Sequence, residues 1–275
     1  MNNHLIVPFL IGQRRDGLCR IRDVDDHAWD TLTLSEFQAT KIEDSNEKLR
    51  RMGKVYRLLS EKVKTLSGMG LVPIVLAGDC ISTLGVLAGL QKSGKQPDRI
   101  LWLDAHGDFH TWRTSATKYL GGMPLAMLVG RIDENEEHFY HINSMLREIE
   151  VNPYPEKQII LSDARDLDIG EKEALQKSKI VVCEISEILA QLIPNESLYI
   201  HWDTDVVDAE VETPALKYHV KNGPNYSEIE TIFKCIARKD IVAISISAWH
   251  EERDLENKAV TACLGVIKNL QDVLC

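Results

Sequence analysis

Three potential metal ligands alternate directly after an apolar run in the segment LWLDAHGDFHT, residues 101–111. They are Asp104, His106 and Asp108. Alternate side chains of an extended backbone share one face, so we expect these three groups to enter one small volume. Carboxylates that converge without a counter-ion raise each other's pKa, and a bound divalent cation removes that conflict. The spacing therefore predicts half of a metal cage.

Two other apolar runs also end in acidic or sulfur-bearing side chains. LVPIVLA is followed by Asp79 and Cys80, and SLYIHW is followed by Asp203 and Asp205, again two residues apart. One such pair alone is more often a turn or helix-capping feature than a metal site. Clusters at the ends of three separate runs together favour a site for two metal ions.

Seven short apolar runs are candidates for the strands that position these groups. The runs are continuous rather than alternating, which is typical of strands covered on both faces in a parallel sheet. They cover residues 5–11, 71–78, 99–105, 158–164, 180–185, 197–203 and 240–247. Amphipathic segments lie between them, and Ser45 is the expected cap of the first. The expected helices cover residues 45–66, 81–91, 226–238 and 257–274.

The alternation of strands and helices predicts an α/β fold with a doubly wound sheet. Ligands of such sheets bind outside the carboxyl ends of the strands, where the three polar clusters fall. No internal repeat, low-complexity tract or Pro/Ser-rich linker interrupts the chain, so we expect a single domain over residues 1–275.

Composition excludes several classes of partner. The chain has 275 residues and a formal net charge of −10, without a dense basic stretch, which argues against nucleic acid and anionic membranes as partners. The N-terminal segment lacks a basic region of the kind that precedes a signal sequence, and no apolar run reaches the ~20 residues that span a bilayer. Six scattered cysteines without a CxxC motif suit a reducing compartment. We therefore expect a cytoplasmic protein.

With DAHGD, DTDVVD and the upstream GDC-x-S in this order across residues 71–250, the chain resembles the ureohydrolases. This superfamily includes arginase, agmatinase and formiminoglutamase, and RDLDIGE at residues 165–171 resembles a substrate-binding loop of arginases. The resemblance implies an arginase-type three-layer α-β-α sandwich around a mostly parallel eight-stranded sheet. In its motifs the chain is most similar to the branch that hydrolyses N-hydroxyarginine.

The resemblance also implies a function and a metal centre. The implied enzyme cleaves a linear C–N bond of a guanidino or modified-guanidino amino acid and releases urea or a urea derivative. Two divalent ions, usually manganese in this family, share a water and lower its pKa, and Asp168 orients the amino-acid end of the substrate. One metal would be held by Cys80, Asp104, Asp108 and Asp203, and the other by Asp104, His106, Asp203 and Asp205.

Cys80 departs from the common family pattern, which has a histidine ligand at this position. The hydroxyarginine hydrolases also carry cysteine here, and a thiolate is a competent ligand that could shift the preference towards zinc, iron or cobalt. The alternative is that Cys80 is a small buried hydrophobic residue and one metal site is weak or absent.

Gly121, within YLGGMP, replaces the acid/base histidine of arginases. Glycine cannot transfer a proton, so His110 and His219 are possible substitutes. The hydroxyarginine hydrolases resemble the chain here as well, with a pair of glycines. A hydroxyguanidine leaving group depends less on a proton donor, which would make the loss tolerable.

Ser247 stands where arginases place a glutamate that grips the guanidinium. A hydroxyl cannot form the charge-assisted bidentate pair of a carboxylate, which argues against ordinary arginase activity. We expect Ser247 and His110 to line the pocket. Glu251 and Glu252 follow closely in the sequence and are alternative carboxylate donors.

Two other functions stay open at this point. A catalytically degenerate member that binds a ligand or regulates a partner would explain both losses, but not the retention of all five Asp and His ligands. A different amidine substrate, such as a formimino or agmatine-like compound, would require recognition rebuilt around Trp249 and His250, although we expect Trp249 to be packed. An oligomer is possible, as in many relatives, without a specific signal in the sequence.

Overall fold

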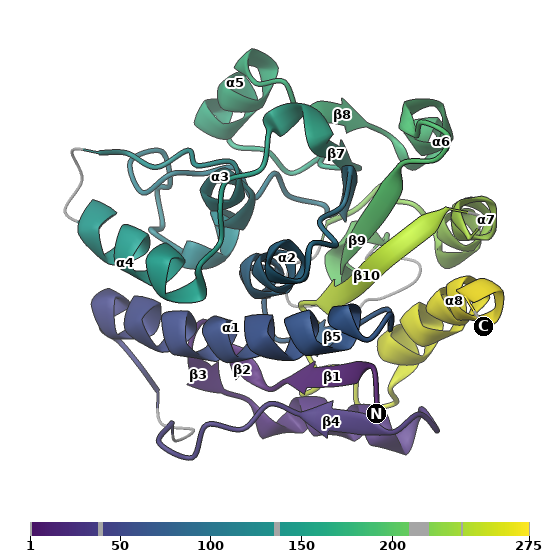
Figure 1. Cartoon of the computed structure of the whole chain (residues 1–275). Coiled ribbons are helices and arrows are strands. Elements are labelled where there is room, and N and C mark those ends of the chain that lie inside the picture. Colours follow the sequence, from purple (N-terminus) through teal and green to yellow (C-terminus); the bar gives the residue numbers. More distant parts are fainter. Residues whose placement is uncertain (1, 38–40, 135–137, 209–219, 238, 275) are drawn as a thin grey trace.

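The computed structural model describes residues 2–37, 41–134, 138–208, 220–237 and 239–274, with side chains up to residue 268. Eight strands form one sheet in which every pairing is parallel, and helices cover both of its faces (Figure 1). The predicted three-layer α-β-α architecture is thereby confirmed. The strand order is β4 (Trp29–Thr31), β1 (His4–Val7), β5 (Ile74–Ala77), β10 (Asp240–Ser247), β9 (Ser197–Asp203), β6 (Arg99–Leu103), β7 (Ile159–Ser162), β8 (Val181–Cys183).

Each of the seven predicted apolar runs overlaps one strand of this sheet. The eighth strand, β4, has three residues and lies at the edge of the sheet, too short to stand out as an apolar run. A separate antiparallel hairpin follows β1 and pairs β2 (Phe9–Leu10) with β3 (Gln13–Arg14).

The four predicted helices are present as α1 (Ser45–Gly68), α2 (Ser82–Ser93), α7 (Tyr226–Ile236) and α8 (Lys258–Leu274). The expected cap of α1 was wrong by one residue: the carboxylate of Asp44, and not Ser45, accepts the backbone N–H of Glu47 at 2.6 Å. Four shorter helices were not predicted from the sequence, namely α3 (Pro124–Leu128), α4 (Phe139–Ile149), α5 (Ile169–Lys177) and α6 (Ile188–Gln191).

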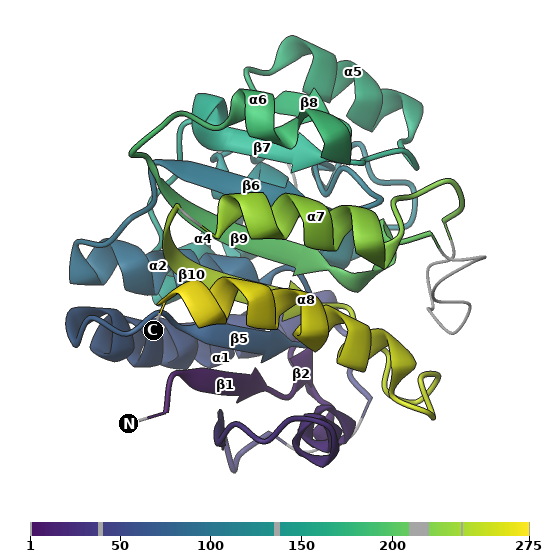
Figure 2. The same ribbon diagram turned by 90° about the vertical axis from the view of Figure 1, so that its right-hand side faces the viewer.

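Two apolar cores lie on opposite faces of the sheet. On β5, Val75 and Ala77 pack into the core beneath α1 and α2, whereas Ile74 and Leu76 pack into the core beneath α7 and α8. Figure 2 shows α7 and α8 side by side across the second face. Because both faces are covered, successive strand residues are all buried, which explains why the strands read as continuous apolar runs.

The order of the central strands determines which polar groups meet. β5, β10, β9 and β6 are neighbours, so the chain segments that leave their carboxyl ends converge at one edge of the sheet. Those segments begin with Gly78, Ala248, Thr204 and Asp104. No helix in the described part of the chain is both long enough and apolar enough to cross a bilayer.

Candidate metal centre

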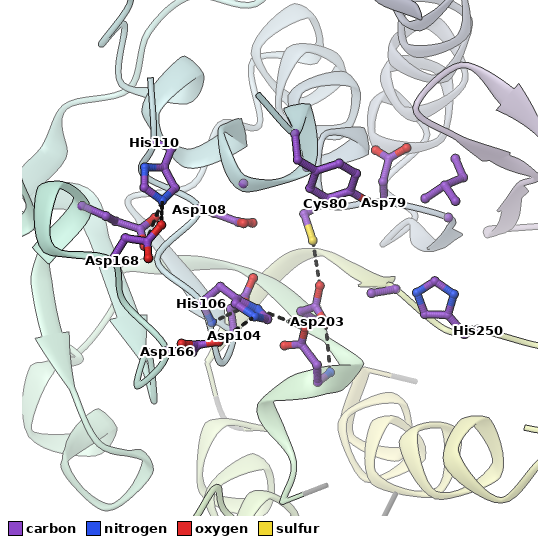
Figure 3. A pocket seen from close by; sticks show the side chains of 18 residues that line it. Asp79, Cys80, Asp104, His106, Asp108, His110, Asp166, Asp168, Asp203 and His250 are labelled. Atoms are coloured by element: carbon purple, nitrogen blue, oxygen red, sulfur yellow. Dashed lines mark hydrogen bonds and ion pairs between the residues drawn. The ribbon is translucent and has the colours of Figure 1, made fainter. Parts of the chain in front are cut away.

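A pocket with a cavity volume of about 190 Å³ opens at the carboxyl ends of the central strands (Figure 3). Its walls come from the segments that follow β5, β6, β7, β9 and β10. All six predicted metal ligands line it, namely Cys80, Asp104, His106, Asp108, Asp203 and Asp205.

Asp104, His106 and Asp205 form the first group of potential ligands. One donor atom from each lies within 4.8 Å of the others. His106 Nδ1 is 3.3 Å from Asp104 Oδ1 and 3.1 Å from Asp205 Oδ2. The backbone N–H groups of Ala105 and His106 donate to Asp205 and Asp104, which fixes the directions of both carboxylates.

Cys80, Asp104, His201 and Asp203 form the second group, also within 4.8 Å of one another. Cys80 follows β5 and precedes α2, and its Sγ lies 2.8 Å from Asp203 Oδ2 (Figure 3). Asp104 belongs to both groups, so the structure brings together two adjacent candidate cation positions that share a carboxylate. This arrangement is the one expected of a dinuclear centre.

Asp108 adds an acceptor that lacks a partner in the protein. Its Oδ2 is buried and, among the described residues, makes no hydrogen bond, although it lines the pocket. The residue adopts a left-handed backbone conformation with φ of 51°, which is uncommon for a non-glycine residue and often marks functional sites. A buried carboxylate oxygen without a donor is costly, and a cation would offset that cost. The residues present therefore fit a metal centre.

The pKa shifts of the acidic side chains also favour bound cations. Burial raises the pKa of Asp104, Asp108 and Asp203, and neighbouring carboxylates raise it further. Burial also raises the pKa of Asp205, but the stronger combined effect of hydrogen bonding and charge attraction, led by His106, leaves that pKa below its usual value. Without cations, these groups cannot all ionise together.

His110, Asp168 and Glu171 form the opposite wall of the pocket. His110 Nε2 lies 3.3 Å from Asp168 Oδ2 and 3.8 Å from Glu171 Oε2. Asp168 is largely exposed at the mouth, whereas Glu171 is buried and accepts the backbone N–H of Phe109. Burial raises the pKa of Glu171 to about 7 and lowers that of His110. The structure thus places His110 and Asp168 together on the pocket wall.

Ser247 does not line the pocket, contrary to our expectation. It is fully buried behind Cys80, with its Oγ 3.2 Å from Cys80 Sγ and 3.5 Å from Asp203 Oδ2. Ser247 is the last residue of β10, and its register partner on β9 is Asp203, so its side chain faces the same layer as the metal ligands. Of the residues that follow β10, Ala248 and His250 line the pocket.

The alternative carboxylates are already engaged elsewhere. Arg15 Nη2 donates to Glu251 at 3.1 Å and to Glu252 at 2.6 Å, and neither residue lines the pocket. Trp249 is buried and donates to Asp254, so it is packed as predicted, whereas His250 lines the pocket.

Gly121 lines the pocket beside Tyr119, whose ring occupies the space that a side chain would need. A Cβ at Gly121 would lie 2.4 Å from Cε1 of Tyr119. His219, the second possible substitute for the missing acid/base histidine, lies outside the described residues.

Two residues of this site were missed in the sequence. His201 precedes Asp203 by two positions, so HWDTD continues the same alternation that revealed Asp104, His106 and Asp108. Glu171 closes the RDLDIGE motif, and its burial at the start of α5 could not be seen from the local pattern.

The chain is similar in sequence and fold to several known proteins. The sequence profile of the arginase family matches residues 14–270. An arginase of Brevibacillus brevis is 27% identical over 224 residues, covering 77% of the chain and 69% of the relative. An N(omega)-hydroxy-L-arginine amidinohydrolase of Streptomyces lavendulae is 28% identical over 201 residues, covering 70% and 67%. The Entamoeba histolytica arginase crystallised with L-ornithine superposes with a TM-score of 0.79 at 19% identity, covering 97% of each chain.

Proposed function

The chain belongs to the arginase family, and on that premise we propose that it is a dinuclear metal-dependent hydrolase of guanidino compounds. The reaction is hydrolysis of a linear C–N bond in a guanidino or modified-guanidino amino acid, with release of urea or a urea derivative. The observation that carries the proposal is the pair of ligand groups that share Asp104 on the pocket wall, next to the unpartnered carboxylate oxygen of Asp108.

The proposed centre holds two divalent cations, with manganese as the family's usual metal. Cys80, Asp104, Asp108 and Asp203 would hold one ion, and Asp104, His106, Asp203 and Asp205 the other. When bound, such a pair lowers the pKa of a shared water and supplies hydroxide near neutral pH.

The opposite wall is the proposed site for the amino-acid end of the substrate. Asp168 and Glu171 each place a carboxyl oxygen near His110 Nε2, at 3.3 Å and 3.8 Å, and acidic groups suit an α-ammonium group. His110 is the proposed proton carrier, because it is the histidine of this wall and lies beside Gly122, which follows Gly121 in the chain.

A modified guanidine suits this pocket better than arginine itself. With Ser247 behind Cys80 and both Glu251 and Glu252 paired with Arg15, the segment after β10 offers no carboxylate to grip a guanidinium cation. N-hydroxyarginine-like compounds carry a less basic group and a leaving group that depends less on a proton donor. The choice rests on these features of the pocket, because the chain is about equally similar to the Streptomyces amidinohydrolase (28% identical) and to the Brevibacillus arginase (27% identical).

The test combines a metal count with a substrate panel. Protein purified without added metal is analysed for bound ions, then assayed with manganese, zinc and cobalt on arginine, N-hydroxyarginine, agmatine and formiminoglutamate. We expect two equivalents of metal and highest turnover on N-hydroxyarginine. Asp205→Asn should lose metal and turnover, whereas Asp240→Asn, an exposed acid at the other end of β10, should change neither.

Bound metal without turnover on any compound would contradict the enzyme and favour the alternative of a ligand-binding or regulatory family member. An absence of metal under all loading conditions would contradict the metal centre itself. The cytoplasmic location stays a prediction from the sequence.

A further inference from the structure

His201 lies in the middle of the sheet, fully buried next to the pocket residues Cys80, Asp104 and Asp203. It lies on β9 between its register partners Trp102 on β6 and Ser245 on β10. Its side chain is fully buried and points to the same face as Asp203, two residues further along the strand. No acid pairs with this ring at salt-bridge distance among the described residues, so the ring is not present to balance a charge.

The contacts of His201 orient one ring nitrogen towards the candidate cation. Nδ1 lies 2.9 Å from Ser245 Oγ, which also contacts the hydroxyl of Tyr199. The Trp102 ring packs against the imidazole at 4.3 Å between centroids. These contacts fix the plane of the ring and occupy Nδ1, as the outer partners of metal-binding histidines usually do.

The other ring nitrogen, Nε2, lies on the side of Cys80 and has a weak hydrogen-bond partner. Its hydrogen-bond contact is Ser247 Oγ at 3.4 Å, and that hydroxyl lies closer to Cys80 Sγ, at 3.2 Å. A donor nitrogen of His201 nevertheless lies within 4.8 Å of donor atoms of Cys80, Asp104 and Asp203. In the tautomer whose Nδ1–H donates to Ser245 Oγ, Nε2 carries the lone pair that a metal needs.

We propose that His201 is a ligand of the cation at Cys80, which makes this position a thiolate–imidazole–carboxylate site. The inference rests on the proposed function, in which the pocket binds divalent cations. The ligand set becomes Cys80, Asp104, His201 and Asp203, with Asp108 at its edge. The second position keeps Asp104, His106, Asp203 and Asp205.

The two positions then differ in the metal that they prefer. Sulfur and nitrogen ligands select zinc, cobalt(II) or iron(II) over manganese, whereas carboxylates and a single imidazole suit manganese. We therefore expect a mixed centre, with a softer cation at Cys80 and manganese as an acceptable occupant of the Asp205 side.

A crystal structure of the unmodified protein grown with zinc tests the ligand directly. A zinc ion about 2.0–2.1 Å from His201 Nε2 and about 2.3 Å from Cys80 Sγ supports the proposal. Zinc at Cys80 with its remaining ligands drawn only from Asp side chains and water, and Nε2 beyond bonding distance, overturns it while leaving the proposed function intact.

Cobalt(II) absorption provides a solution readout that does not depend on turnover. In the unmodified protein we expect a sulfur-to-cobalt charge-transfer band from Cys80 and ligand-field bands of a low-coordinate site. His201→Gln should keep the charge-transfer band, shift the ligand-field bands and weaken zinc binding at least on the order of 10-fold. Cys80→Ser should remove the charge-transfer band.

His141→Gln, which removes a partly buried histidine on α4 away from the pocket, is the matched control and should leave spectrum and affinity unchanged. A His201→Gln protein that retains both the spectrum and the zinc affinity of the unmodified protein overturns the inference. Unmodified protein that binds no divalent cation instead overturns the proposed function on which it rests.

Discussion

At the scale of single residues, the Tyr119 ring packs beside Gly121, the position at which the resemblance to arginases implies an acid/base histidine. The Tyr119 ring fills the volume beside Gly121, so a new side chain at 121 has no room unless the ring moves. Tyr119 is partly exposed at the pocket, which allows the ring to be removed without opening the core.

We predict that Gly121→His alone does not increase turnover of arginine, because the ring blocks the imidazole. In a Tyr119→Ala background the same substitution should increase kcat by up to about 10²-fold, because a positioned general acid can contribute a factor of that size. Urea release by the four proteins of this double-mutant cycle measures the coupling. Equal effects of Gly121→His in both backgrounds would contradict the steric explanation.

The carboxylate of Asp168 leads to a second prediction at this scale. Asp168 is exposed at the pocket mouth and contacts His110, so its proposed role is to bind the amino-acid end in ground state and transition state alike. Asp168→Asn should therefore raise KM by on the order of 10-fold with a smaller change in kcat.

Steady-state kinetics on the best substrate of the panel measures this split. Glu173→Gln, an exposed acid one turn further along α5, is the matched control and should leave both constants unchanged. A fall in kcat at constant KM would assign Asp168 to the chemical step instead.

At the scale of elements, the close approach of α1 and α2 supports the segment that carries Cys80. Gly85 and Gly89 of α2 face α1, and a Cβ at Gly89 would lie 2.6 Å from the carbonyl oxygen of Ser60. Because that neighbour is backbone, the helices would have to separate. Cys80 lies just before α2, so the position of this ligand depends on the packing of the two helices.

We predict that Gly89→Ala lowers the free energy of unfolding by about 1–3 kcal/mol, as overpacking usually does. Gly265→Ala provides the contrast, because a Cβ there meets no atom within 4 Å and alanine favours a helix by up to about 1 kcal/mol. Urea denaturation of both variants measures the difference. The same sign of effect in both would argue against close helix packing as the cause.

At the scale of the whole molecule, one sheet separates two apolar cores and connects them. Adjacent residues of each central strand belong to opposite cores, as Leu76 and Ala77 do on β5. Because the same strands contribute residues to both cores, unfolding of one core would expose the other to solvent. We therefore propose that residues 1–275 form a single domain.

The corresponding prediction is one cooperative unfolding transition. Trp102 reports on the core under α1 and α2, and Trp202 and Trp249 report on the core under α7 and α8. Tryptophan fluorescence and far-ultraviolet circular dichroism should give the same urea midpoint. Two separated midpoints, with Leu84→Ala shifting only one of them, would contradict a single domain.

The sequence by itself determined the strands of the sheet centre and the groups at their ends. Both depend on local alternation: buried parallel strands read as apolar runs, and Asp104, His106 and Asp108 share a face because they are two residues apart. The edge strand β4 was not predictable in this way, since its three residues depend on pairing with β1.

Only the tertiary structure decided which distant side chains meet. Cys80 and His201 come together because β5, β10 and β9 are neighbours in the sheet and Cys80 lies between the end of β5 and the start of α2. Ser247 is covered for the same reason. Its hydroxyl contacts the thiol of Cys80, 167 residues earlier in the chain, because β5 and β10 pair with Ile74 opposite Ile244. Such contacts follow from strand order and packing, which local spacing along one segment does not contain.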